Sequence, residues 1–245
     1  MLSVHAAVLL TLLIKHYPLY LLINLLWTGA TVSGHRELQR LIKPLKVEFH
    51  ALNLNSTLHW QPGSDAAGDI TYFVQYKVYG QNLWKNKEEC WGIREVFCDL
   101  THETSDIREP YYGRVKSVSA GVHSDWNTSS RFTPWRETKI GPPSLKVTPR
   151  NKSIQLKLRA PNSPYKRRRG SKIPMTNYYD LLYRVFLISN MLDEKQKILM
   201  YEGTDKVVKI EDLKSEVSYC IVVETYLPML DRSSACSSKI CTVPL

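Results

Sequence analysis

The sequence predicts an all-β protein built from two tandem β-sandwich modules, and three observations support this. Apolar and polar residues alternate along short segments, turn-forming residues separate these segments, and the pattern of the first half recurs in the second half. No segment after the N-terminal leader keeps a 3.6-residue apolar period over a useful length. The 245 residues suffice for two modules of about a hundred residues each.

The N-terminal residues 1–33 are predicted to be a secretory signal peptide. They hold one charged residue, Lys15, and an apolar run from Tyr17 to Trp27, and small residues follow where cleavage is expected, between Ala30 and Gly34. An uncleaved membrane anchor is the alternative, because the apolar stretch is nearly long enough to span a bilayer, although polar residues and a proline interrupt it. No comparable apolar run follows, so we expect a soluble product.

The first module is organised around a strand at residues 72–79. Tyr72, Val74, Tyr76 and Val78 face a core and alternate with residues of the opposite face, Phe73, Gln75, Lys77 and Tyr79. Tyr79 falls on the polar face, beside Gly80 at the strand end, so an exposed aromatic side chain is expected at a loop. The alternative is that this tyrosine packs along the outer sheet against a long Lys or Arg side chain.

The remaining strands follow from the same alternation. In the first module they are expected at 45–49, at 57–60 before Pro62-Gly63, at 111–120 and at 126–132. A proline-rich connector at 133–143 should link the modules semi-rigidly. Strands of the second module are expected at 145–147, 154–158, 179–188 and 219–223, and the module boundaries at 34–139 and 140–245.

An internal repeat relates the two halves. Residues 74–79 align with 181–186 at an offset of 107, and Tyr111 aligns with Tyr219 at an offset of 108. Tyr219 enters a strand six residues after Leu213. A tyrosine in this position is typical of the corner of fibronectin-type sandwiches, where its hydroxyl bonds back to the backbone.

The five cysteines indicate disulfides with one cysteine left over. Cys90 and Cys98 are eight positions apart, roughly 27 Å if the chain is extended, so they can pair only if it turns back between them, near Gly92. In the second half Cys220 has two possible partners, Cys236 and Cys241. Three triplets have the form of glycosylation sites, beginning at Asn55, Asn127 and Asn151.

The positive charge is concentrated in the second half. Of the formal net charge of +10, residues 35–141 contribute 14 Lys/Arg against 13 Asp/Glu, and residues 142–245 contribute 18 against 10. The run Lys166-Arg167-Arg168-Arg169 is consistent with a proprotein-convertase site, a heparan sulfate contact or a solvated loop between Pro164 and Pro174.

Motifs for catalysis and cofactor binding are missing from the sequence. We find no G-x-G-x-x-G, P-loop, G-x-S-x-G or H-E-x-x-H, and the histidines lack the spacing of metal ligands. The acid and base residues within 102–106 have the composition of an ordinary polar loop. We therefore expect no enzyme, cofactor, metal or nucleic-acid partner.

The sequence resembles class II cytokine receptors in three features: the strand end Trp60-Gln61-Pro62, a closely spaced cysteine pair in the first module, and a widely spaced pair, Cys220 and Cys241, in the second. The segments WKNKEECWG, TSDIREPYYGRV, RFTPWRETKIGPP, LLYRVF and PMLDR strengthen the resemblance to a soluble member of this family. It implies two fibronectin type III modules joined at an elbow. It also implies the disulfides Cys90–Cys98 and Cys220–Cys241, leaving Cys236 as a cysteine that the family does not predict.

The resemblance implies that a helical cytokine binds through loops at the elbow. Because no membrane-spanning run follows the leader, it also implies a secreted monomeric decoy receptor for an interleukin-22-like helical cytokine, without cofactors. Alternatives are a processed ectodomain of a signalling receptor and an adhesion module that binds heparan sulfate. Carried over residue by residue, the expected contacts are Tyr79, Gly80, Gln81, His102, Thr104, Val122, His123 and Ser124 in the first module, and Pro164, Tyr165, Leu227, Pro228 and Met229 in the second.

Overall fold

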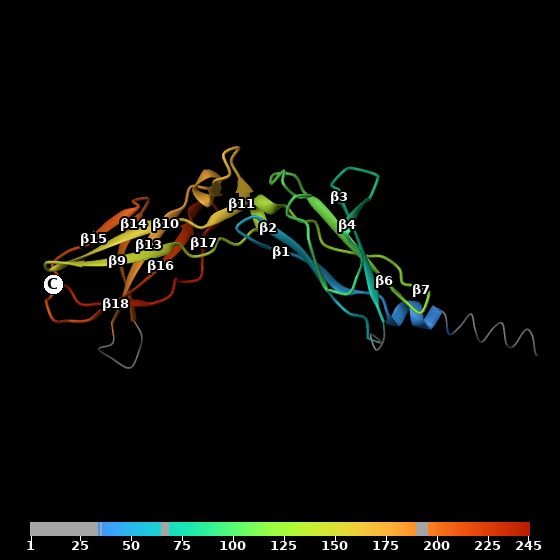
Figure 1. Ribbon diagram of the computed structural model, residues 1–245, viewed down its shortest axis with the longest axis horizontal. Coiled ribbons are helices and arrows are strands. Elements are labelled where there is room, and N and C mark those ends of the chain that lie inside the picture. Colours follow the sequence, from blue (N-terminus) through green and yellow to red (C-terminus); the bar gives the residue numbers. More distant parts are fainter. Residues whose placement is uncertain (1–33, 35, 65–68, 190–195) are drawn as a thin grey trace, which may run out of the picture.

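A computed structural model describes residues 34, 36–64, 69–189 and 196–245, so the expected signal peptide lies outside the described part of the chain. Two β-sandwiches lie end to end and give an elongated molecule (Figure 1). The prediction of an all-β chain with two tandem sandwich modules is therefore confirmed. Among the described residues, no helix has the length and apolar character needed to cross a bilayer.

The first module packs a three-stranded sheet against a five-stranded one, with antiparallel pairing throughout. Val47, Leu58, Trp60, Val74 and Val115 are buried between the sheets. The smaller sheet has the order β1 (Leu45–Leu52), β2 (Asn55–Gln61) and β5 (Phe97–Asp99). The larger has the order β4 (Lys85–Ile93), β3 (Thr71–Val78), β6 (Tyr111–Ser119) and β7 (Val122–His123), with β8 (Asn127–Thr128) also on β6.

The disulfide Cys90–Cys98 joins the two sheets of the first module, because Cys90 lies in β4 and Cys98 in β5. The chain passes between the sheets at residues 94–96, and not near Gly92 as expected. Gly92 lies inside β4 with a φ of 87°, in a strand whose register with β3 shifts twice. These irregularities bury every third residue, Lys87 and Cys90, which explains why period-two alternation does not predict β4.

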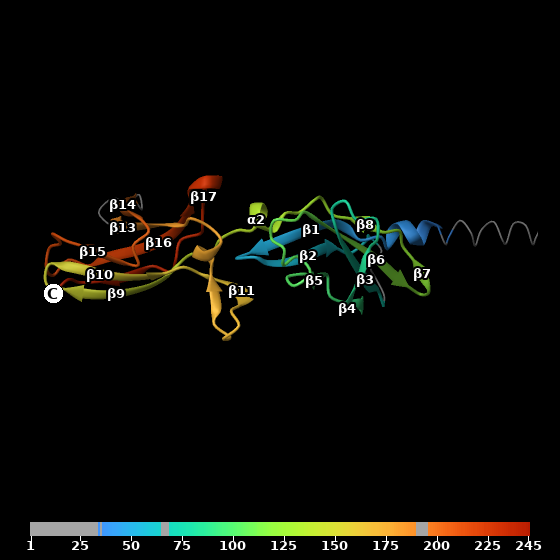
Figure 2. The same cartoon turned by 90° about the horizontal axis from the view of Figure 1, so that it is seen from above.

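The second module repeats this plan. Its smaller sheet has the order β15 (Val207–Ile210), β10 (Ser153–Arg159) and β9 (Ser144–Arg150). Its larger sheet has the order β14 (Gln196–Gly203), β13 (Leu182–Ser189), β16 (Tyr219–Leu227) and β17 (Arg232–Ser233), with β18 (Ile240–Thr242) also paired to β16. A separate hairpin, β11 (Asn162–Lys166) and β12 (Lys172–Pro174), projects from the body of the module (Figure 2). Cys220 and Cys241 lie opposite each other in β16 and β18 and are bonded, and Cys236 is free, so the predicted pairing is confirmed.

Corner tyrosines confirm that the modules are copies. Tyr111 donates a hydrogen bond from its hydroxyl to the carbonyl of Asp106 at 3.1 Å, and Tyr219 accepts one at its hydroxyl from the amide of Lys214 at 3.1 Å, five residues upstream in both cases.

The register corrects the predicted alignment of the repeat. Tyr72 lies opposite Ser117, and Tyr183 lies opposite Thr225. Ser117 and Thr225 differ by 108 positions, the same offset as the corner tyrosines, so Tyr72 and not Tyr76 corresponds to Tyr183, at an offset of 111. A shift of four residues keeps every side chain on its face, so the alternation alone could not detect it.

Two expected strands are shorter than predicted. Residues 126–132 form only β8 and a single bridge between Phe132 and Tyr111. In the second module β13 begins at Leu182, because Tyr179 and Leu181 are buried in a cluster between the modules.

The connector is fixed to the turn between β1 and β2. After the short helix α2 (Pro134–Glu137), the backbone carbonyl of Lys139 accepts a hydrogen bond from the amide of Asn53 at 2.8 Å. The side chain of Thr138 accepts one from the amide of Leu54, and the side chain of Asn53 accepts one from the amide of Gly141, each at 2.8 Å. The proposed boundary between residues 139 and 140 therefore lies in an ordered segment.

Candidate functional site

The two modules meet around a groove of about 450 Å³ at the elbow. Arg108 and Trp135 line it from the first module, and two segments of the second module close it, residues 176–180 and 227–230. Beneath it, Leu54, Met175, Tyr179, Leu181 and Leu227 form a buried apolar cluster that belongs to both modules. We call the groove and the segments around it the elbow surface; these segments are the loops at 79–81, 101–110 and 227–230 and residues 162–165 of β11.

Trp135 is the central contact of the groove. Its ring stacks on that of Tyr179, the Arg108 guanidinium lies 5.2 Å from the indole centroid, and its amide donates to the carbonyl of Ile107 at 2.8 Å. Burial raises the pKa of the Tyr179 hydroxyl, which donates to the Trp135 carbonyl at 2.9 Å. Aromatic stacking and a hydrogen bond therefore connect the modules at one point.

The loop after β3 places Tyr79 on the surface beside this junction. The side chain is 55% exposed, and its amide donates to the carbonyl of Pro110 at 2.8 Å, next to the segment that packs on Trp135. Gly80 has a φ of 83°, a conformation that favours glycine. Arg131 lies over the Tyr79 ring, 5.7 Å from its centroid, and the Tyr112 ring lies 6.3 Å away, so the alternative of packing along the outer sheet describes part of the surroundings of Tyr79. More than half of the residue nevertheless remains exposed to a partner.

The loop at 101–106 is held by a partly buried ion pair. Lys87 in β4 lies 2.6 Å from Glu103 and 3.0 Å from Glu89. Burial alone would lower the pKa of Lys87, but the hydrogen bonds with Glu103 and Glu89 raise it above its ordinary value. Thr104 is fully buried and bonds the carbonyl of Leu100, so it supports the loop, and His102 is exposed on it.

Strand β11 of the second module reaches back to this segment. Tyr165 donates from its hydroxyl to the carbonyl of Thr101 at 3.1 Å, and its ring meets Tyr178 edge to face. Burial, with a smaller contribution from Tyr178, raises the pKa of Tyr165 to about 12. Tyr165 and Pro164 are half-buried, so they present only part of their surface.

The last loop projects Met229, which is 67% exposed, while Leu227 is buried beneath it and Pro228 is exposed. Its turn, η2 (Pro228–Leu230), ends at Asp231, which has a left-handed φ of 46°. Tyr226 supports the loop by donating from its hydroxyl to Asp231 at 2.9 Å.

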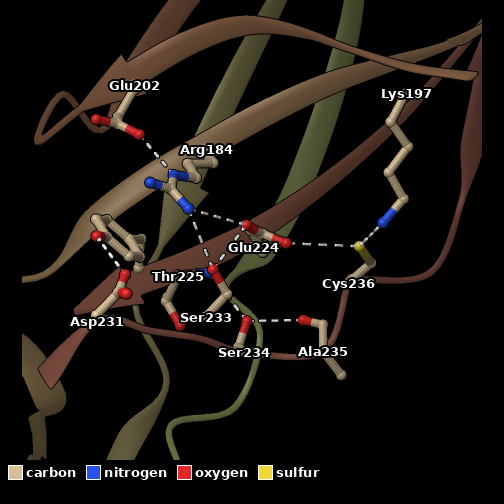
Figure 3. A network of polar contacts seen from close by, with 11 residues as sticks. Arg184, Lys197, Glu202, Glu224, Thr225, Asp231, Ser233, Ser234, Ala235 and Cys236 are labelled. Carbon is tan, nitrogen blue, oxygen red and sulfur yellow. Dashed lines mark hydrogen bonds and ion pairs between the residues drawn. The ribbon is translucent and has the colours of Figure 1, made fainter. Parts of the chain in front are cut away.

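Arg184 anchors that tyrosine through a wider network (Figure 3). Its guanidinium lies 3.4 Å from the Tyr226 ring centroid, 2.5 Å from a carboxylate oxygen of Glu202 and 3.8 Å from Glu224. The free Cys236 lies at the edge of this network, 2.9 Å from the ammonium group of Lys197. The base of the loop at 227–230 is therefore fixed while its tip is exposed.

One predicted segment does not belong to the elbow. The segment at 121–124 follows β6, contains β7 and lies at the end of the first module that faces away from the second (Figure 1). Val122 packs in the core of its module, and Ser124 bonds the amide of Ser117, so both are structural. His123 is exposed, but at that far end. The expectation that these three residues lie at the elbow is wrong.

Sequence reasoning also missed residues that line the groove. The groove is lined by Arg108, Trp135, Tyr178 and Asp180. From the sequence, Trp135 is expected only as part of the connector, and no role is expected for the other three. An unexplained tryptophan between two prolines was the available signal, because a large aromatic side chain in a linker needs a surface to cover.

The three glycosylation triplets differ in accessibility. Asn55 and Asn151 are exposed in β2 and in the turn between β9 and β10. Asn127 is half-buried, and its side-chain amide donates to the carbonyl of Pro44 at 2.8 Å. The Asn127 nitrogen to which a glycan would be attached is thus already hydrogen-bonded within the fold.

The sequence matches two family models that divide it between the modules. Residues 18–126 match the tissue factor family, and residues 138–244 match the fibronectin type III domain of the interferon-alpha/beta receptor. In solved structures, the chain is similar to the chicken interferon gamma receptor alpha chain, with a TM-score of 0.61 and 21% identity over 84% of this chain and 100% of that one. At this identity the similarity concerns the fold.

Curated relatives are closer in sequence. Interleukin-22 receptor subunit alpha-2 from Rattus norvegicus is 48% identical and that from Homo sapiens 44%, each over 93% of this chain and 97% of the relative. Interleukin-20 receptor subunit alpha from Homo sapiens is 34% identical over 81% of this chain but only 36% of its own length. The chain therefore belongs to the class II cytokine receptor family and, within it, groups with interleukin-22 receptor subunit alpha-2.

Proposed function

We propose that the protein is a secreted, monomeric decoy receptor that binds an interleukin-22-like helical cytokine at the elbow surface and so keeps it from its membrane receptor. The observation that carries the proposal is that exposed side chains of both modules lie at loops of the junction: Tyr79 follows β3, beside Pro110, and Met229 lines the groove. The sequence identity to relatives named interleukin-22 receptor subunit alpha-2 supports the choice of cytokine.

The elbow surface has the properties of a protein-binding site. Large apolar or aromatic side chains project from loops, and the Lys87–Glu103 pair, the Trp135–Tyr179 stack and the Arg184 network hold the bases of those loops in place. A rigid frame lowers the entropy lost on binding, and exposed tyrosine is common among residues that dominate binding energy. We assign the contacts to Tyr79, Gly80, Gln81, His102, Pro164, Tyr165, Pro228 and Met229, with Thr104 and Leu227 as support.

The test has two steps. Purified protein is captured on a surface and interleukin-22 is passed over it, and the same protein is then added to cells that report signalling by the membrane receptor. The proposal expects saturable 1:1 binding and dose-dependent loss of signalling. Absence of binding would contradict the choice of cytokine, and binding without loss of signalling would contradict the decoy role.

A further inference from the structure

The outer face of the sheet β15-β10-β9 carries several basic side chains, of which Lys209 in β15 pairs with Glu211. Lys146 in β9 and Lys157 in β10 lie directly opposite each other, and both are exposed. In the described part of the chain, neither belongs to an ion pair. Like charges directly across an antiparallel pair destabilise a sheet, so this arrangement costs stability unless an anion compensates it.

Lys146 and Lys157 line the first of two adjacent hollows. The first, about 220 Å³, is lined by Ser144, Leu145, Lys146, Lys157 and Arg159. The second, about 490 Å³, shares Ser144 and Arg159 with the first and continues past Lys206 to Asn162 and Pro174. Neither hollow has an Asp or Glu among its lining residues. The two together form one basic channel on the surface of the second module.

The channel leads to the β11–β12 hairpin. Asn162 and Pro174, which line the second hollow, pair at the base of the hairpin, and Lys166 lies opposite Lys172 near its tip. The backbone carbonyl of Arg167 accepts a hydrogen bond from the amide of Gly170, and the backbone amide of Arg167 donates one to the carbonyl of Ser171, each at 2.8 Å. The tip is thus an ordered turn that presents Arg167, Arg168 and Arg169, all exposed. We call the channel and the hairpin together the basic track.

We propose that the basic track binds a linear sulfated glycosaminoglycan. Arginine forks match tetrahedral oxyanions in a bidentate way, and lysines along a strand suit a partner charged along its whole length. The two disulfides indicate an oxidising environment such as the extracellular space, where such chains are abundant and nucleic acids are not. The lining of the two hollows includes one aromatic residue, the buried Tyr183, so it offers no platform for stacking bases.

The elbow groove and the two hollows share only Thr176, but β11 of the track also carries Pro164 and Tyr165 of the elbow surface. Variants of the track that leave Pro164 and Tyr165 unchanged should therefore separate glycosaminoglycan binding from cytokine binding. The track would retain the protein near cell surfaces through a salt-sensitive interaction. This inference does not depend on which cytokine, if any, the elbow surface binds.

The test compares three triple variants with the same change in charge. Two lie in the track, Lys146→Gln/Lys157→Gln/Arg159→Gln and Arg167→Ser/Arg168→Ser/Arg169→Ser, and the control, Lys85→Gln/Lys214→Gln/Lys239→Gln, removes exposed lysines elsewhere. Affinity for a defined heparin oligosaccharide is measured at physiological salt, with desulfated oligosaccharide and duplex DNA as competitors. Interleukin-22 binding is measured in parallel.

We expect each track variant to bind heparin at least about tenfold more weakly and the control less than about twofold more weakly. Desulfated oligosaccharide and DNA should compete poorly, and cytokine binding should persist in all three variants. Equal losses in the control would show that net charge alone is responsible, and wild-type protein that fails to bind at physiological salt would overturn the proposal. Competition by DNA as strong as that by heparin would also overturn it, in favour of nonspecific polyanion binding.

Discussion

The indole of Trp135 and the phenol ring of Tyr179 stack across the junction of the two modules, with their centroids 5.9 Å apart and their planes 15° from parallel. Because the Tyr179 hydroxyl also bonds the Trp135 carbonyl, this pair resists both sliding and opening of the elbow. The relative position of the loops from the two modules therefore depends on it.

Replacing Tyr179 by Phe should weaken cytokine binding without removing a contact to the cytokine. The change deletes one buried hydrogen bond, for a loss of about 1 kcal/mol in the free energy of unfolding, and allows the elbow to open. The control is Tyr183→Phe, which removes a buried hydroxyl bonded to the backbone of Ala160 inside the second module. Urea unfolding should show similar losses of unfolding free energy for both variants, but only Tyr179→Phe should bind the cytokine more weakly. Equal cytokine affinities of the two variants would contradict a role of the junction in binding.

The Lys87–Glu103 pair provides a second test of how the surface is supported. Its side chains are 10% and 15% exposed, so removing one partner leaves a partly buried charge with fewer hydrogen bonds. Glu103→Leu should cost about 2 kcal/mol in the free energy of unfolding, because Glu89 still compensates part of the charge. The double variant Lys87→Met/Glu103→Leu should be more stable than Glu103→Leu alone. Additive losses in a double-mutant cycle would mean that the pair contributes no coupling.

The sequence predicted the parts of the site that depend on local pattern. Tyr79 follows from strand alternation next to a glycine, and its exposure is confirmed. The position of residues 122–124 could also have been deduced, since consecutive loops of an antiparallel sheet lie at alternate ends. The loop before β6 is at the elbow, so the loop after β6 is at the far end. Trp135 could not be assigned, because its partner Tyr179 is 44 residues away and belongs to the other module.

High pH should loosen the contact between the modules. The pKa of Tyr165 is raised to about 12, above the ordinary value near 10, so the folded state holds this proton more tightly than the unfolded state. Its stabilising contribution is complete below about pH 10 and is lost as the pH rises toward 12. Urea unfolding at several pH values should show this decline, and Tyr165→Phe should make it shallower. An unchanged slope in the variant would contradict the assignment.

Cys236 should be the single cysteine that reacts with an alkylating reagent in the native protein, because the other four are paired. Cys236→Ser should leave the free energy of unfolding nearly unchanged. Cys220→Ser/Cys241→Ser should cost roughly 3.5 kcal/mol by the loop-entropy estimate. Peptide mapping without reduction checks the pairing, and a disulfide-linked peptide that contains Cys236 would refute it.

Tyr79→Ala tests the elbow surface most directly. Two controls accompany it: His123→Ala, an exposed residue at the far end of the same module, and Tyr76→Ala, whose side chain packs against the module core and should instead impair folding or secretion. With interleukin-22 in a surface-capture assay, we predict that Tyr79→Ala folds normally but binds with about 2 kcal/mol less free energy, roughly a 30-fold weaker Kd, while His123→Ala binds like wild type. Wild-type affinity in folded Tyr79→Ala protein, or a comparable loss in His123→Ala, would contradict binding at the elbow.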